Sequence, residues 1–312
     1  MPSHRTRISI IGCGHVGTSC AHALLLNRLP DELILIDGTP DKALGEALDL
    51  QHAVPLGTPM KITAGTYKDA AASAIVIITV GAPGKFPGNR LEMLAGSIGL
   101  VRECIAKLMA ENFGGILLIA TNPVDVVTYI AQTESGLPVG HVIGTGTLVD
   151  SERLRFILGA NLNVDARSIH ASVIGEHGDS SVAVWSAAQI AGLPLALYPT
   201  ADALPSHEEL LKQVRHAGPE VAELKGYTSH AIAACVTRIC EAILRDERSA
   251  LVVSTRITGQ YGLHDVSFST PSIVGKGGIE SVLELHLDVA EQKALEHSAN
   301  ILQQAAAQLK AV

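Results

Sequence analysis

Aromatic residues are scarce in this chain of 312 residues, since phenylalanine, tryptophan and tyrosine together make up 3%. The core must therefore consist mainly of alanine, valine, isoleucine and leucine, as is typical of a buried parallel sheet covered by helices. Charged residues are also sparse at 17%, whereas hydrophobic residues reach 47%, which excludes an intrinsically disordered chain. The length is about twice that of a usual domain, so we expect two domains or one large α/β domain.

Cysteine is present but does not form the patterns of disulfide-rich or zinc-binding proteins. The count is odd and no pair has CxxC spacing, which excludes a disulfide framework and a cysteine zinc site. The five residues are Cys13, Cys20, Cys104, Cys235 and Cys240. We therefore expect reduced thiols in a cytoplasmic protein. The net charge of −8 disfavours nucleic acid and anionic membranes as partners.

Long hydrophobic runs are absent as well. The longest apolar runs, at residues 74–80 and 114–120, are about seven residues long, whereas a membrane span needs about 20. The polar N-terminus lacks the apolar region of a signal peptide. No HExxH pattern and no paired cluster of metal ligands occurs, so we expect no bound metal.

Short apolar runs alternate with helical stretches in the first half of the chain. This alternation predicts a parallel, doubly wound sheet. The predicted strands are residues 7–11, 32–36, 74–80, 115–120 and 141–145. The predicted helices are residues 15–27, 41–52, 91–111 and 123–132.

The pattern changes after about residue 149, which indicates a second, α+β domain. We place the boundary near residue 146, with a dinucleotide-binding domain over residues 1–146 and a catalytic domain over residues 147–312. Helices are predicted at residues 151–158, 206–224, 228–246 and 288–309, and strands at residues 168–174, 250–254 and 266–269. The last helix begins with Asp288 and Glu291 at the spacing of a capping box.

A glycine-rich motif, Gly12-Cys-Gly-His-Val-Gly17, follows the first strand and opens the first helix. Gly12 allows the tight turn, Gly14 lets a pyrophosphate approach the backbone, and Gly17 lets the helix pack closely on the sheet. Val16 lies within the same motif and is a further candidate for the cofactor site. The free N–H groups at the helix start attract phosphate.

An acidic residue, Asp37, ends the second strand 20 residues after the last glycine of the motif. A carboxylate at this place accepts hydrogen bonds from ribose hydroxyls and repels a 2′-phosphate, so the motif favours NAD over NADP. The alternative, a tight turn followed by a turn-forming aspartate, is less consistent with the combined strand, spacing and acid.

Several polar residues whose side chains could take part in catalysis or binding follow strands or begin helices. His177 follows a strand, and histidine is the commonest general acid–base. Asn122 follows the fourth predicted strand, and Asp150 and Arg153 are three residues apart at a helix start. Arg90 follows a segment rich in glycine and proline, which predicts a lid. The alternatives are an N-cap for Asp150 and solvated surface charges for the two arginines.

The segments around these residues resemble the L-lactate/L-malate dehydrogenase family over essentially the full chain. The resemblance rests on the stretches IGCGHVG, TNPVDVVTY, VIGTGTLVDSERLR, IGEHGDS and KGYTSHAIA. It implies an NAD-binding Rossmann sheet followed by an α+β catalytic domain, and hydride transfer between NAD and a small 2-oxo or 2-hydroxy acid.

The resemblance also implies a role for each matching residue. His177 would exchange a proton with the 2-oxygen of the substrate, and Asp150 would orient its ring and favour the imidazolium. Arg153 would bind the substrate carboxylate, and Arg90 would polarise the ketone as the lid closes. Asn122 would bond near that oxygen and border the cofactor.

Two further residues, Thr228 and Ile232, would line the substrate and nicotinamide pockets. At the loop position that distinguishes lactate enzymes (Gln) from malate enzymes (Arg), this chain has Gly84. Malate is therefore disfavoured, and the extra room makes L-2-hydroxyisocaproate dehydrogenase, which acts on larger 2-oxo acids, the alternative to lactate dehydrogenase. His230 also replaces a residue that is commonly aromatic in lactate enzymes.

Arg155 and His170 match positions found in bacterial lactate dehydrogenases that fructose 1,6-bisphosphate regulates. The resemblance thus implies this effector, bound between subunits of a homotetramer or homodimer. Arg155 is two residues from Arg153 on one helix, so the two side chains should point to different faces. The alternative is a pair of ordinary surface charges.

Overall fold

A parallel sheet forms the centre of the computed structural model, which describes residues 6–57, 59–81 and 90–310. Its strands are β1 (Arg7–Ile11), β2 (Glu32–Ile36), β3 (Lys61–Ala64), β4 (Ile75–Ile78), β5 (Ile116–Ile119) and β6 (Val142–Gly144). They lie side by side in the order β3-β2-β1-β4-β5-β6, which is the order of doubly wound dinucleotide-binding sheets. The predicted fold class is confirmed, although the sequence pattern does not predict β3, a short edge strand.

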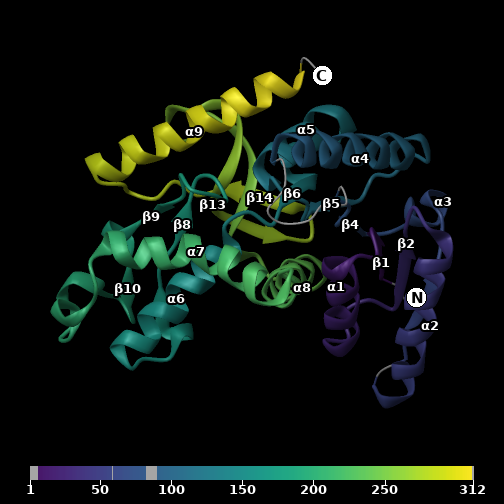
Figure 1. Cartoon of the computed structure of the whole chain (residues 1–312), viewed down its shortest axis with the longest axis horizontal. Coiled ribbons are helices and arrows are strands. Elements are labelled where there is room, and N and C mark those ends of the chain that lie inside the picture. The colour runs from purple at the N-terminus through teal and green to yellow at the C-terminus, as the bar shows by residue number, and fades with distance from the viewer. Residues whose placement is uncertain (1–5, 58, 82–89, 311–312) are drawn as a thin grey trace.

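Helices cover both faces of this sheet, as Figure 1 shows. One apolar layer lies under α4 (Arg90–Ala110), α5 (Val124–Ser135) and α9 (Val289–Lys310). The layer on the other face lies under α1 (His15–Leu26), α2 (Pro40–Ala53) and α8 (His230–Leu244). A short helix, α3 (Tyr67–Ala70), precedes β4. The strands between these layers are almost wholly aliphatic, because both of their faces are buried.

The second half of the chain extends the same sheet. Strands β12 (Ser249–Thr258), β13 (His264–Gly275) and β14 (Gly278–Val282) add antiparallel to it, with Ser254 of β12 opposite Gly144 of β6. The predicted strands at residues 250–254 and 266–269 lie inside β12 and β13 but are too short. The sheet therefore continues across the domain boundary near residue 146, which stays a prediction.

The rest of the second half packs beside the sheet on its own apolar cluster. This cluster joins α6 (Leu148–Leu162) and α7 (His207–Lys225) through Leu154, Leu158, Leu210 and Val214. Two small sheets complete it, formed by β7 (Ile169–His170), β10 (Gln189–Ile190) and β11 (Leu193–Pro194), and by β8 (Val173–Ile174) and β9 (Val182–Ala183). The predicted single strand at residues 168–174 is wrong, because β7 pairs with β10 whereas β8 pairs with β9.

Two helix starts bear on the predictions. The capping box is confirmed, since the Asp288 backbone N–H donates to Glu291 Oε2 at 3.0 Å and the Glu291 N–H donates to Asp288 Oδ1 at 2.9 Å. Helix α6 begins three residues earlier than predicted, with Thr147 as its N-cap. Asp150 therefore lies inside the first turn, and its alternative role as an N-cap is wrong.

The five cysteines are all buried free thiols. Within residues 6–57, 59–81 and 90–310, no helix has the length and apolar character needed to cross a membrane. Over the same residues, no group of three or more histidine, cysteine, aspartate or glutamate side chains is arranged to hold a metal ion.

Candidate functional site

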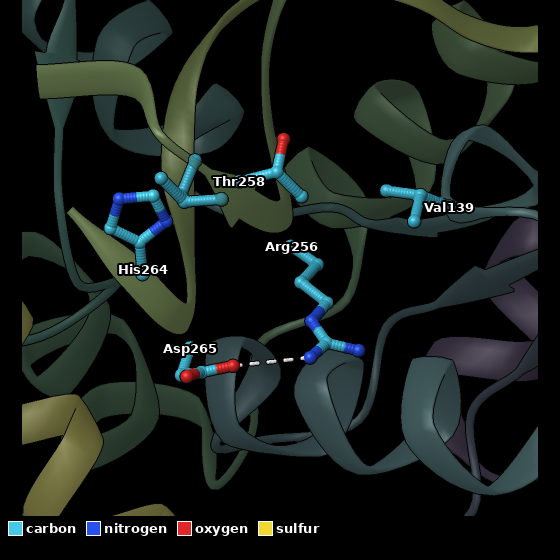
Figure 2. A pocket seen from close by; sticks show the side chains of 6 residues that line it. Val139, Arg256, Thr258, His264 and Asp265 are labelled. Atoms are coloured by element: carbon cyan, nitrogen blue, oxygen red, sulfur yellow. Dashed lines mark hydrogen bonds and ion pairs between the residues drawn. The ribbon is translucent and has the colours of Figure 1, made fainter. Parts of the chain in front are cut away.

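One surface cavity, of about 420 Å³, lies at the hairpin between β12 and β13 (Figure 2). Its wall consists of Val139, Arg256, Ile257, Thr258, His264 and Asp265. Arg256 and Asp265 pair with each other at 3.2 Å. None of these residues is among the predicted site residues, so the predicted chemistry has to be sought elsewhere.

The carboxyl ends of the parallel strands bring several predicted residues to one edge of the sheet. Gly12 follows β1, Asp37 follows β2 and Asn122 follows β5, and these strands all run in the same direction. In sheets with this strand order, ligands bind at this edge near the point where the order reverses, which here lies between β1 and β4.

The glycine motif has the geometry of a close backbone approach. Gly12 has a φ of +107°, and a Cβ on Gly17 would lie 1.9 Å from the Gly12 carbonyl oxygen, so neither position accommodates a side chain. A Cβ on Gly14, in contrast, would meet nothing within 4 Å. The space beside Gly14 is thus open at the N-terminus of α1, where a phosphate can reach the free N–H groups.

Asp37 joins the end of β2 to this motif. Its Oδ2 accepts from the Cys13 N–H at 2.7 Å and its Oδ1 accepts from the Thr39 N–H at 2.9 Å. Each oxygen keeps a further lone pair, so the carboxylate can still accept from ribose hydroxyls. Val16 of α1 and Ile232 of α8 are half-buried and pack on the apolar layer beneath these helices.

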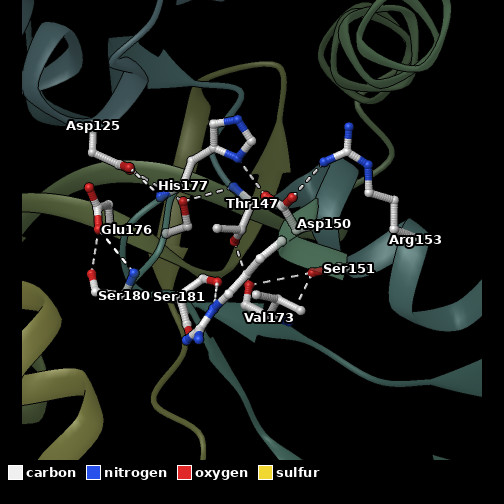
Figure 3. Close-up of polar contacts among 12 residues, drawn as sticks. Asp125, Thr147, Asp150, Ser151, Arg153, Val173, Glu176, His177, Ser180 and Ser181 are labelled. Carbon is white, nitrogen blue, oxygen red and sulfur yellow. Dashed lines mark hydrogen bonds and ion pairs between the residues drawn. The ribbon is translucent and has the colours of Figure 1, made fainter. Parts of the chain in front are cut away.

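The second group of predicted residues meets around Asp150 (Figure 3). One carboxylate oxygen of Asp150 lies 2.5 Å from His177 Nδ1, and the other accepts from Arg153 Nη1 at 2.9 Å. The side chain of Asp150 is only 7% exposed, whereas those of His177 and Arg153 are 24% and 21% exposed. A buried anion therefore holds an imidazole and a guanidinium at the edge of a solvent-accessible site.

Hydrogen bonds between α6 and β8 fix the position of Asp150. The Thr147 hydroxyl donates to the Val173 carbonyl, and the Val173 N–H donates to Ser151 Oγ at 3.0 Å. The Thr147 N–H also donates to Ser269 Oγ of β13 at 3.0 Å. Because these bonds flank Asp150 on both sides, the first turn of α6 is held against the strand that leads to His177.

Asp125 is a residue of this site that the sequence analysis does not single out. Its Oδ2 accepts from the His177 backbone N–H at 2.7 Å, and Ser269 Oγ lies 3.4 Å from its Oδ1. The residue is 2% exposed, although it lies in the first turn of α5. The signal that points to it is an acidic residue with valines on both sides, in the stretch TNPVDVVTY.

The carboxylates determine how the site titrates. Burial acts to lower the pKa of His177. The attraction to Asp150 and the hydrogen bond that Asp150 accepts act to raise it, and they outweigh burial, so the pKa is raised. Burial acts to raise the pKa of Asp150, but His177 and Arg153 outweigh it, and the net pKa is lowered. Burial raises the pKa of Asp125 to about 6, against the hydrogen bond from His177. The imidazolium is therefore favoured.

For the remaining predicted residues the structure gives a position in the fold but no contact with Asp150 or His177, and some of them lie outside the described residues. Asn122 is exposed and Thr228 is half-buried just before α8. Arg90 is the first residue of α4, but its side chain lies outside the described residues, as does Gly84. A cavity of about 460 Å³ between α6 and α7 includes Arg153 in its wall.

The side chain of one predicted effector residue, Arg155, reaches the backbone next to the other, His170. Arg155 Nε donates to the carbonyl oxygen of Ala171 at 3.2 Å, and Ala171 is the residue after the exposed His170. Arg155 also pairs with Glu152 at 2.8 Å, a contact that the sequence analysis does not predict. The Arg155 side chain is thus held by the Ala171 carbonyl and the Glu152 carboxylate.

Comparison with known proteins places this geometry in context. Residues 6–144 match the family model "lactate/malate dehydrogenase, NAD binding domain", and residues 147–312 match "lactate/malate dehydrogenase, alpha/beta C-terminal domain". The L-lactate dehydrogenase of Thermoanaerobacter pseudethanolicus is 44% identical over 300 residues, 95% of this chain and 96% of the relative. That of Priestia megaterium is 44% identical over 303 residues, 96% and 95% of the two chains.

Solved structures agree with these sequence matches. The minor L-lactate dehydrogenase from Enterococcus mundtii, in its ligand-bound form, superposes with a TM-score of 0.93 at 35% identity and covers 97% of this chain and 98% of its own. A lactate dehydrogenase from a deep-sea metagenome library of the Medee basin has the same TM-score and identity, with 98% and 99% of the two chains covered.

Proposed function

The chain belongs to the lactate/malate dehydrogenase family, and from this premise we propose that it is an NAD-dependent L-lactate dehydrogenase that reduces pyruvate to L-lactate. The observation that carries the proposal is the Asp150 carboxylate between His177 and Arg153, 2.5 Å from one and 2.9 Å from the other. Reduction of a 2-oxo acid needs a proton donor and a cation for the carboxylate, and this arrangement offers both.

The first half of the chain fits a dinucleotide. The open space beside Gly14, the free N–H groups of α1 and the Asp37 carboxylate match the pyrophosphate and the ribose hydroxyls. When bound, NADH supplies the hydride, so the protein has to bind, orient and protonate the substrate. Asn122, Thr228 and the side chain of Arg90 are proposed to border the reacting groups.

In this proposal His177 delivers the proton. Its Nδ1 is held by Asp150, so Nε2 is the atom that gives its proton to the substrate oxygen as the hydride arrives. Arg153 uses only Nη1 for Asp150, and its remaining donors are available for the substrate carboxylate. Because Asp150 holds both groups, it sets the distance between the proton donor and the carboxylate clamp.

Substrate choice depends on the loop that contains Gly84, which lies outside the described residues. The relatives compared above are all named lactate dehydrogenases, which supports pyruvate over the larger 2-oxo acids and over oxaloacetate. The experiment is a comparison of kcat/KM for pyruvate, 2-oxoisocaproate and oxaloacetate at saturating NADH. A preference for pyruvate is expected, and a higher kcat/KM for either other acid would contradict the proposal.

We also propose that fructose 1,6-bisphosphate activates a homotetramer or homodimer of this chain in the cytoplasm, where lactate formation would end glycolysis. Arg155 and His170 from two subunits would bind the two phosphates, with Arg155 exchanging its contact with Glu152 for the ligand. The test is the pyruvate saturation curve at about pH 6 with and without the bisphosphate, with Arg155→Gln as control. Identical curves for the parent enzyme would contradict this part.

A further inference from the structure

We propose that the stacked pair of His15 and Tyr227, with Lys225 above the tyrosine, is a clasp that retains the pyrophosphate of the bound dinucleotide. The two ring centroids lie 3.8 Å apart and the ring planes differ by 6°. Lys225 Nζ lies 4.5 Å from the centroid of Tyr227. The inference rests on the cofactor site proposed above, and it assigns three residues to that site.

The position of His15 relates the stack to the phosphate loop. His15 is the first residue of α1 and follows Gly14, beside which the space is open. Its side chain is exposed, and Tyr227 is 36% exposed. Neither ring therefore belongs to the apolar core, and core packing does not account for their contact. Their contact lies at the entrance through which a pyrophosphate would approach the helix.

The position of Tyr227 relates the stack to the substrate pocket. Helix α7 ends at Lys225 and is capped by Gly226, whose φ is +89° and whose N–H donates to the Ala222 carbonyl at 2.8 Å. This left-handed C-cap turns the chain at the residue before Tyr227. Thr228, a predicted substrate residue, follows directly. The stack thus ties the loop between α7 and α8 to the start of α1, and α1 and α8 are packed side by side (Figure 1).

The charges of the clasp suit a diphosphate. The chain as a whole has a net charge of −8, and two acidic groups, Asp37 and Glu46, act on the motif residue Cys13 together with one basic group, Lys42. Lys225 brings a positive charge to this region, and His15 brings a ring N–H donor. A pyrophosphate is anionic and rich in acceptor oxygens, so both groups favour it. The expected ligand chemistry is therefore a diphosphate-bridged dinucleotide.

A clasp of this kind should act mainly on the rate of cofactor release, because the stacked rings have to separate before the pyrophosphate can leave. An aromatic pair contributes roughly a twofold to tenfold factor in an equilibrium constant. We expect Tyr227→Leu to release NADH about twofold to tenfold faster than the parent. Tyr227→Phe keeps the ring and is the matched control, with an expected rate equal to that of the parent. Lys225→Met should accelerate release about twofold to fivefold.

The experiment measures NADH release by stopped-flow fluorescence, and affinities for ADP-ribose and adenosine by their displacement of NADH. ADP-ribose keeps the pyrophosphate and lacks the nicotinamide, whereas adenosine lacks both. The Tyr227 ring also holds Lys225 in place, so its loss in Tyr227→Leu predicts weaker binding of NADH and ADP-ribose and unchanged binding of adenosine. Parent-like release of NADH, an equal loss of adenosine binding, or the same defect in Tyr227→Phe would each overturn the proposal.

These binding measurements are made without substrate, so they are independent of the reaction proposed for the enzyme. A parent protein that binds NADH but does not reduce pyruvate would contradict the proposed function. The release rates of Tyr227→Leu, Tyr227→Phe and Lys225→Met would still test the clasp. Conversely, turnover of pyruvate together with parent-like release in Tyr227→Leu would overturn the clasp alone.

Discussion

Replacing Asp150 with asparagine tests the proton relay most directly, because the substitution keeps the shape of the side chain and removes its charge. The carboxylate lies 2.5 Å from His177 Nδ1 and 2.9 Å from Arg153 Nη1, and it is 7% exposed. Opposite charges about 4 Å apart at an effective dielectric constant of about 20 attract each other by about 4 kcal/mol. In Asp150→Asn, burial still lowers the pKa of His177 and Arg153 still repels the imidazolium, so only the smaller attraction of Asp125 acts to raise this pKa.

We therefore expect kcat/KM for pyruvate at neutral pH to fall by about 10²-fold to 10⁴-fold, and the alkaline limb of its pH profile to move to lower pH, because the raised pKa of His177 is lost. Lactate oxidation, which uses the neutral imidazole, should retain a larger share of its rate. The assay is kcat/KM in both directions from about pH 5 to about pH 9. Asp165→Asn is the matched control, because Asp165 is an exposed carboxylate paired with Arg167. A pyruvate profile of Asp150→Asn that overlays that of the parent would refute the reasoning.

Three further substitutions separate the roles of the other residues. His177→Ala should lower turnover by about 10²-fold to 10⁴-fold with nearly unchanged NADH affinity, and turnover within about threefold of the parent would contradict the assignment. Asp37→Ser should raise the ratio of activity with NADPH to activity with NADH, because it removes the charge that repels a 2′-phosphate. An unchanged ratio would show that Asp37 does not contact the ribose. Burial raises the pKa of Asp125 to about 6, so the folded protein keeps a proton that the unfolded chain has already lost, and the stability of the parent relative to Asp125→Asn should fall by about 2 kcal/mol from pH ~4 to pH ~7. Urea titrations at the two pH values measure this difference, and an equal change of stability in the parent and in Asp125→Asn would exclude the raised pKa of Asp125.

The central sheet could be predicted from the sequence because its strands carry an unmistakable apolar pattern. β4 and β5 are wholly aliphatic and buried on both faces. β3 could not be predicted in this way, because it is an edge strand of four residues with an exposed lysine at its start. The extension of the sheet by β12–β14 also escapes it, because the pairing of Ser254 with Gly144 is a long-range contact that no local pattern records.

The site was predictable where its residues lie in motifs and not where tertiary contacts define them. His177, Asp150 and Arg153 occur at helix and strand ends with recognisable spacing, and the structure brings all three together. Asp125 could not be assigned to the site from the sequence because its partner is a backbone N–H, and nearly every residue carries that group. Glu152 was missed because a carboxylate on an exposed helix face has no distinguishing feature until its partner is known.

The continuity of the sheet between β6 and β12 has a consequence for biosynthesis and for truncation. β6 is complete at residue 144, but the strand that covers its outer edge begins about a hundred residues later. A nascent or truncated chain that ends near residue 146 therefore presents unpaired backbone N–H and C=O groups at that edge, which is the surface on which strands of other molecules add. Closing it late is a non-local step that slows folding and extends the time during which the chain can aggregate. The central sheet is therefore complete only when both halves of the chain have been synthesised.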